Sequence, residues 1–140
     1  MFEVGEVYRR RELHERYGGQ EQGGISTPSK HPSIMLFWGD TGEQYGYKDG
    51  WVSPDRFLYT GEGQRGDMSM VRGNRAIRDH VSDGKALHLF KKASKGQVQY
   101  EGEMVCTGYR EQPGPDHEAR QRKTIVFELT PRAAFPRRLE

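Results

Sequence analysis

The stretch Phe57-Leu58-Tyr59-Thr60-Gly61-Glu62-Gly63 joins an apolar and aromatic run to a glycine-punctuated turn. Residues 56–60 predict a short strand, and the glycines predict a turn over 61–67. Outward from this stretch, the chain repeats the same short strand pattern several times. Further strands are predicted at 2–8, 33–38, 86–91, 97–100, 103–110 and 123–130, with a loop at Gly114-Pro115 between the last two.

Two segments predict short helices between these strands. Leu13 and Tyr17 share one face of a helix over 9–17, which the glycines at 18 and 19 end. A second helix is predicted over 72–82. Its predicted inward residues are Ala76, Ile77, His80 and Val81. Many short strands with one or two helices predict an α+β fold, a small, partly closed, twisted β-barrel flanked by one or two short helices.

Length and composition favour a single domain over 1–140. The 140 residues carry 22 Lys+Arg against 20 Asp+Glu, a formal net charge of +2, and one cysteine. A lone Cys106 excludes an internal disulfide and a cysteine-based zinc site. The sequence has no apolar run of membrane-spanning length, and no signal-peptide hydrophobic region follows Met1. We therefore expect a cytoplasmic protein with no membrane partner.

The small net charge hides a segregation of signs along the chain. Residues 72–95 hold seven Lys/Arg and two Asp, a balance of +5, whereas residues 40–67 hold six Asp/Glu and three Lys/Arg, a balance of −3. This separation allows a basic face for a polyanion beside a site that keeps its carboxylates. Charge alone favours the plainer alternative of a mixed, solvated surface.

Catalytic patterns are weak in this sequence. Its five histidines show no paired metal-ligand spacing, and the chain has no phosphate-binding Lys-Ser/Thr loop. We therefore expect no enzymatic activity, no catalytic residue, no metal and no cofactor. One alternative stays open: Asp49, Glu62 and Asp67 could form the carboxylate cluster of a metal-dependent nuclease, although acidic glycine turns are common for conformational reasons alone.

Four aromatic residues flank the acidic turn, namely Tyr45, Tyr47, Trp51 and Tyr59. Paired aromatic faces with an oxygen acceptor between them suit a flat polar heterocycle such as a nucleobase. The alternative is that each ring belongs to the core of a small barrel. For any single ring, this alternative is the stronger one.

Six motifs, taken in chain order, resemble the SRA domain, a barrel of the PUA superfamily that flips 5-methylcytosine out of duplex DNA. They are Val4-Gly5 with Tyr8-Arg9-Arg10 and Gly23-Gly24-Ile25, Gly46-Tyr47-Lys48-Asp49, the opening 57–63 stretch, Arg72-Gly73-Asn74-Arg75-Ala76-Ile77, Tyr100-Glu101-Gly102, and Lys123 to Leu129. The fold that the resemblance implies is a PUA/SRA-like barrel. The resemblance covers most of the chain. Within the family, the sequence is similar to the N-terminal reader domains of bacterial HNH endonucleases that cut modified DNA.

The resemblance also implies roles in a base pocket. Tyr47 and Tyr59 would sandwich the flipped base, Thr60 would bond its edge through its hydroxyl or its backbone, and Gly46 would leave room for the 5-methyl group. The family places an Asp three residues after the first Tyr, where this sequence has a glycine. Either Asp49, one position earlier, serves in its place, or another group reads the cytosine amine. Trp51 completes the predicted pocket.

Further residues are assigned to the duplex. Gln20, Gln22, Gln64 and Arg65 are the predicted probes of the base stack, because Gln and Arg can both bond an orphan guanine. The probes are short, so we expect little dependence on flanking sequence. The predicted contacts to the phosphate backbone are Gly61, Gly63, Arg72, Arg75, Lys91 and Lys92.

These assignments predict a non-catalytic module that binds double-stranded DNA containing 5-methylcytosine or 5-hydroxymethylcytosine by base flipping. It would target a modification-dependent restriction endonuclease in the bacterial cytoplasm, with a C-terminal HNH nuclease domain in the parent chain. Two alternatives remain: a PUA-like RNA-binding module, and the nuclease based on Asp49, Glu62 and Asp67.

Overall fold

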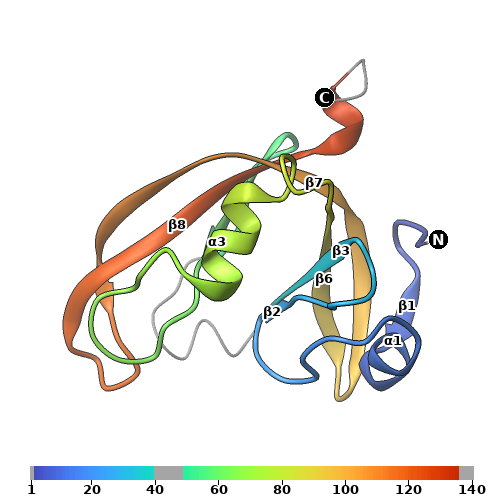
Figure 1. Ribbon diagram of the computed structural model, residues 1–140, viewed down its shortest axis with the longest axis horizontal. Coiled ribbons are helices and arrows are strands. Elements are labelled where there is room, and N and C mark those ends of the chain that lie inside the picture. The colour runs from blue at the N-terminus through green and yellow to red at the C-terminus, as the bar shows by residue number, and fades with distance from the viewer. Residues whose placement is uncertain (1, 40–48, 136–140) are drawn as a thin grey trace.

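A computed structural model describes residues 2–39 and 49–135 of the chain. Its centre is one mixed sheet of eight strands, in the order β2-β3-β6-β7-β8-β5-β4, with β1 paired to β7 (Figure 1). The strands are β1 Val7–Arg9, β2 Ile25–Ser26, β3 Ser33–Trp38, β4 Gly50–Ser53, β5 Arg56–Thr60, β6 Ala86–Ser94, β7 Gln97–Pro115 and β8 Gln121–Pro131. Two α-helices, α1 Arg10–Tyr17 and α3 Arg72–Asp79, and the 3-10 turn η1 Arg132–Ala134 complete the described elements.

Strands β3 and β6 pair in parallel, and the other pairings in the described ranges are antiparallel. Strand β7 is long because its two ends have different partners: β1 and β6 near Gln97, and β8 from Met104 onward. The far part of the β7–β8 hairpin curves around the segment that follows β5 (Figure 1). The backbone N–H of His117 donates to the carbonyl of Gln64 there, at 2.7 Å.

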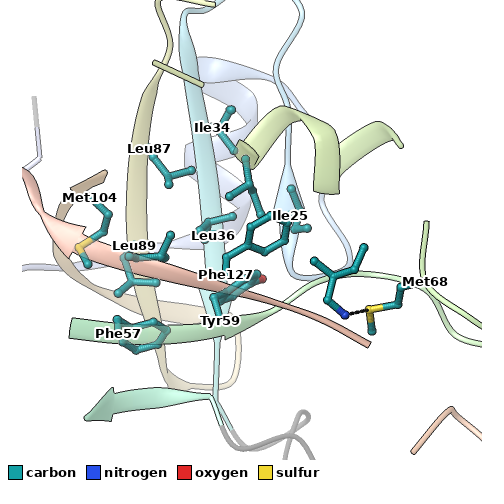
Figure 2. Packing of buried hydrophobic residues seen from close by; sticks show 13 residues of the cluster. Ile25, Ile34, Leu36, Phe57, Tyr59, Met68, Leu87, Leu89, Met104 and Phe127 are labelled. Atoms are coloured by element: carbon teal, nitrogen blue, oxygen red, sulfur yellow. Dashed lines mark hydrogen bonds between the residues drawn. The ribbon is translucent and has the colours of Figure 1, made fainter. Parts of the chain in front are cut away.

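The sheet curls around one main core (Figure 2). Apolar side chains from β2, β3 and β6 meet those from β5 and β8, and Ile77 of α3 is fully buried against them. Met68 packs in the same core, and its sulfur accepts the backbone N–H of Ile125 at 3.2 Å. A second cluster lies around Leu13 of α1, Phe37 and Phe90. The sheet thus carries apolar side chains on both faces.

The sheet is open, which corrects the predicted partly closed barrel. Within the described residues, the outer strands of the path, β2 and β4, pair with one neighbour each and not with one another. Strand β2 has only two residues and β4 only four. Such short edges offer little backbone for a closing ladder, and side chains bridge the gap instead.

Several boundaries also differ from the predictions. The strands predicted at 97–100 and 103–110 are one strand, and this strand runs through the predicted loop at Gly114-Pro115. The predicted first strand, at 2–8, is reduced to β1. Helix α3 ends at Asp79, and Val81, predicted to face inward, is 40% exposed. Of the helices in the described ranges, none combines the length and the apolar character needed to span a bilayer.

His88 gives the fold a predicted pH dependence. Its Nδ1 lies 2.7 Å from the Tyr100 hydroxyl, and burial lowers the pKa of His88 to about 4 from the usual 6.5. The unfolded chain binds a proton that the folded chain excludes, so the free energy of unfolding falls as the pH drops from about 6.5 to about 4. The expected loss is of the order of 3 kcal/mol.

Chemical denaturation at a series of pH values measures this loss. In the variant H88Q, which keeps a polar group beside Tyr100 but does not titrate, we expect a visibly flatter profile over the same window. A variant with the full wild-type slope between pH 6.5 and 4 would show that His88 is not the group responsible.

Candidate nucleic-acid interface

A cavity of about 1040 Å³ lies beside the turn that follows β5. Most of its lining comes from this turn, the start of α3, the β2–β3 edge and the turn between β6 and β7, and Arg10 of α1 and His117 also line it. Gly39 and Asp49, the described residues on either side of 40–48, both line it. The opening motif of the sequence therefore lies at a cavity large enough for a nucleotide.

Hydrogen bonds between Glu62, Asn74 and the start of α3 fix the turn. The Asn74 Oδ1 accepts the backbone N–H of Glu62 at 2.8 Å, and its Nδ2 donates to the Glu62 carbonyl at 3.0 Å. In return, Glu62 Oε2 accepts the N–H of Gly73 at 3.0 Å, at the start of α3. Asn74 is buried, so these bonds satisfy a polar group that would be costly to leave unpaired.

Two glycines leave the space that these hydrogen bonds need. A Cβ on Gly61 would lie 2.5 Å from Asn74 Oδ1, and one on Gly73 would lie 2.7 Å from Glu62 Oε2. The predicted reason for Gly61 was close approach of the backbone to DNA phosphate. The structure supplies another reason, because the missing side chain admits the Asn74 amide.

Tyr59 belongs both to the core and to the cavity wall. Only 3% of it is exposed, and its hydroxyl donates to the carbonyls of Gly24, at 2.8 Å, and Phe37, at 3.1 Å. Burial raises the pKa of Tyr59 well above its usual value, so the phenol stays protonated and remains a donor. The residue is a tie between β5 and the β2–β3 edge as well as a lining residue of the cavity.

Asp49 is the half-buried acceptor at this site. Its Oδ1 accepts the backbone N–H of Thr60 at 2.8 Å, and both residues line the cavity with Tyr59. Burial raises the pKa of Asp49, while the hydrogen bonds from Thr60 lower it. The structure therefore brings together three of the predicted pocket residues, and the Thr60 amide is already bonded to the carboxylate.

Trp51 does not line the cavity, contrary to the prediction. Its Nε1 donates to Glu101 Oε2 at 3.2 Å, and its ring packs edge-on against Phe57 at 5.2 Å between centroids. Trp38 donates to the other oxygen of the same carboxylate. It is Trp38, placed by the sequence only in a buried strand, that lines the cavity. The remaining two predicted pocket residues, Gly46 and Tyr47, lie outside the described residues.

The four predicted probes divide between different settings. Gln20 braces its own loop, because its Oε1 accepts the backbone N–H of Thr27 at 2.7 Å. Gln22 is exposed, and Gln64 lines the cavity. Arg65 is exposed and forms an ion pair of 3.3 Å with Glu118 of the β7–β8 hairpin. Of the four predicted probes, Gln64 is thus the one that lines the cavity, and the side chain of Gln20 is already hydrogen-bonded within the protein.

The residues predicted to contact the DNA backbone also lie in different places. Gly61, Gly63, Arg72 and Lys92 line the cavity. Arg75 is exposed on α3 away from the lining residues, and the Lys91 amine lies 5.1 Å from the centroid of the Trp38 ring. Arg72 has a left-handed backbone, with φ of 49°, at the first residue of α3.

The carboxylates of the nuclease alternative are bonded to the backbone of the described residues. Asp49, Glu62 and Asp67 line the same cavity, but each has an oxygen that accepts a backbone N–H, from Thr60, Gly73 and Lys123 respectively. Over residues 2–39 and 49–135, no group of three His, Cys, Asp or Glu side chains is placed to hold a metal ion.

Arg10 and His117 also line the cavity but were not assigned to it from the sequence. Arg10 stood in the Tyr8-Arg9-Arg10 motif, so the motif was a usable signal. His117 reaches the cavity only because the β7–β8 hairpin folds back on the Gln64 turn, and nothing local to its sequence indicates this.

The curled sheet and its flanking helices define an SRA fold. An SRA domain of SUVH5, solved with hemimethylated CG DNA, matches with a TM-score of 0.66 at 24% identity, over 99% of this chain and 92% of that one. At this identity the match shows the shared fold.

Residues 4–138 match the ScoMcrA-like SRA domain family, and the chain belongs to that family. A structure of the sulfur-binding and SRA domains of ScoMcrA with phosphorothioated DNA matches with a TM-score of 0.75 at 25% identity. The type IV phosphorothioation-dependent restriction endonuclease ScoMcrA itself matches with a TM-score of 0.76 at 26% identity. Both matches cover 97% of this chain, which spans 43% and 30% of those two chains. Among curated proteins, none matches the sequence.

The Tyr59 tie predicts a stability loss in Y59F. Removing the hydroxyl deletes the hydrogen bonds that join β5 to the β2–β3 edge, although the Gly24 carbonyl keeps the Phe37 N–H as a donor; losing a buried hydrogen bond costs about 1–3 kcal/mol. We expect the free energy of unfolding in urea to fall by this amount. The control is Y109F, because Tyr109 is 45% exposed and its hydroxyl lies outside the core. Equal stabilities of Y59F and Y109F would show that the tie contributes nothing.

Proposed function

We propose that this chain is a non-catalytic reader that binds double-stranded DNA containing a modified cytosine and takes that base into the cavity. The observation that carries the proposal is the Asp49 carboxylate, half-buried beside Tyr59 and Thr60 in a cavity of nucleotide size. An ionised carboxylate only accepts hydrogen bonds, and the exocyclic amine of cytosine is a donor.

The relatives support modified DNA as the ligand. The SUVH5 domain was solved with methylated DNA and the ScoMcrA domains with phosphorothioated DNA. In ScoMcrA a sulfur-binding domain is present beside the SRA domain, and this chain matches the SRA family over nearly its full length. We therefore assign the modified base, 5-methylcytosine or 5-hydroxymethylcytosine, to this domain and not the phosphorothioate sulfur.

The energetics of flipping suit an aromatic pocket. Extruding a base costs a few kcal/mol, and each stacked aromatic face returns about 1–3 kcal/mol. In the proposal, Tyr59 supplies one face and Tyr47, outside the described residues, supplies the other. Burying one methyl group contributes about 0.8 kcal/mol, so preference for the methylated base is roughly fourfold for that contact alone.

We further propose that the module directs a modification-dependent restriction endonuclease whose cleaving residues lie elsewhere in a bacterial parent protein, in an HNH domain. The relative ScoMcrA is such an endonuclease by its phosphorothioate dependence, and this chain spans 30% of it. The exposed cations Arg72, Arg75 and Lys91 would contact backbone phosphates and make binding salt-dependent.

The test is a gel-retardation series with one duplex in four forms: unmodified, 5-methylcytosine, 5-hydroxymethylcytosine and phosphorothioate. We expect a methylated or hydroxymethylated form to bind most tightly. D49N places an amide donor where the cytosine amine needs an acceptor, so we expect about a tenfold to hundredfold loss on the preferred duplex. D55N, which changes an exposed carboxylate in the β4–β5 turn, is the matched control and should bind as the wild type does.

Three results would overturn the proposal. Equal binding of the unmodified and base-modified duplexes would remove the modification claim. Tightest binding of the phosphorothioate duplex would move recognition from the base to the backbone. Better competition by a structured RNA than by the modified duplex would favour the RNA-binding alternative.

A further inference from the structure

The cavity is electrically polarised. Three carboxylates line it: Asp49, which directly precedes β4, and Glu62 and Asp67, in the turn after β5. The lining residues from α1, the β2–β3 ends and the β6–β7 turn include no Asp or Glu, and they contribute two cations, Arg10 and Lys92. A third lining cation, Arg72, stands next to Gly73, whose N–H bonds Glu62, so the carboxylate side carries a positive charge as well. The lining around Arg10 and Lys92 carries cations alone and is suited to an anion.

Arg10 is held rigidly in its part of the lining. Its guanidinium lies over the Phe37 ring, 3.8 Å from the centroid. Its Nε donates to His14 Nε2 at 3.1 Å, and one terminal nitrogen, Nη2, donates to the Gly23 carbonyl at 2.8 Å. A guanidinium fixed on an aromatic face loses little further freedom when it binds a ligand.

Among the described residues no carboxylate lies within ion-pair distance of Arg10, although the negative charge of Glu21 acts on it from farther away. The ion pairs there join other residues, whereas Arg11, next along the same helix, pairs with Glu15 at 3.2 Å. The bonded partners of Arg10 are a histidine nitrogen and backbone carbonyls, which bring no negative charge. Its half-buried position lowers its pKa through desolvation. This cation is thus partly desolvated at the cavity, with no carboxylate in direct contact among those residues.

We propose that Arg10, with Lys92, binds a phosphate group of the nucleotide that enters the cavity. The hydrogen bonds of Arg10 to the described residues use Nε and Nη2, so Nη1 offers two donors to phosphate oxygens. A nucleotide has the matching polarity, with amine donors on the base for the carboxylates and an anionic phosphate for the cations. The inference rests on the proposed function and deepens it.

The position of Arg10 separates this contact from ordinary backbone contacts. Arg75 is exposed on α3 and can meet the phosphates of any duplex. Arg10 is half-buried in the cavity, so a phosphate reaches it when the attached nucleotide leaves the helix. The contribution of Arg10 is therefore confined to duplexes whose base is flipped.

The test measures binding of the 5-methylcytosine duplex and its unmodified twin over a series of NaCl concentrations. One lost phosphate contact lowers the slope of log K against log[salt] by about 0.9. We expect R10Q to show this decrease, with about a tenfold weaker affinity, on the modified duplex alone. R10K keeps the charge and should keep the slope. R11Q, on the exposed side of the same helix, is the control and should match the wild type on both duplexes.

Two results would overturn the inference. R10Q with the wild-type slope and affinity would show that no phosphate contacts Arg10. R10Q with weaker affinity but an unchanged slope would assign Arg10 to support of the 20–23 loop alone. Thermal melting checks that each variant folds. If R10Q does not fold, K92Q provides the same test, because the exposed Lys92 amine forms no ion pair with the described residues. An unchanged slope in K92Q would also refute the phosphate site.

Failure of the proposed function is distinguishable from failure of the inference. If the wild type binds both duplexes equally, the modified-base reader is refuted. The inference fails on its own if the wild type prefers the modified duplex and R10Q keeps the wild-type salt slope on that duplex.

Discussion

The hydrogen bonds of the Tyr59 hydroxyl to Gly24 and Phe37 connect parts of the fold that no strand pairing joins. Strand β5 lies near one end of the sheet path and β3 near the other, so this side chain holds the curl of an open sheet. A curled sheet encloses one core and leaves the cavity at its rim. The bridge lies 22 and 35 residues from its partners in sequence, and it requires a neutral phenol, which burial ensures by raising the pKa of Tyr59.

The site and the core therefore share residues. Asn74 fixes the turn that carries Glu62, and Glu62 in turn bonds the start of α3, so the cavity wall is set by buried hydrogen bonds rather than by a free loop. Such preorganisation reduces the ordering cost of binding. Because the cavity wall is built from buried residues, Tyr59 both belongs to the core and lines the cavity.

Local features of the fold were predictable from the sequence, because strand and helix patterns depend on neighbouring residues. The bounds of β3 and β5 agree with the predictions, and α1 differs by one residue. Distant pairings were not predictable. Three features depend on contacts that no local pattern encodes. They are the open sheet, the two tryptophans that donate to Glu101, and the hydrogen bond from the Thr27 N–H to Gln20. The resemblance of ordered motifs identified the family, yet Trp51, which it assigned to the pocket, is not among the cavity-lining residues, and Arg10, which it gave no role there, is. A motif specifies residue types but not which neighbour each side chain meets.

In the proposed mode of binding, a modified cytosine leaves the duplex and enters the cavity beside Asp49. A crystal structure of the chain with a short duplex containing one 5-methylcytosine tests this most directly. We expect an extrahelical cytosine against the Tyr59 wall, with its amine within hydrogen-bond distance of the Asp49 carboxylate. A complex in which the methylated base remains stacked in the duplex, with the cavity free of any base, would contradict it.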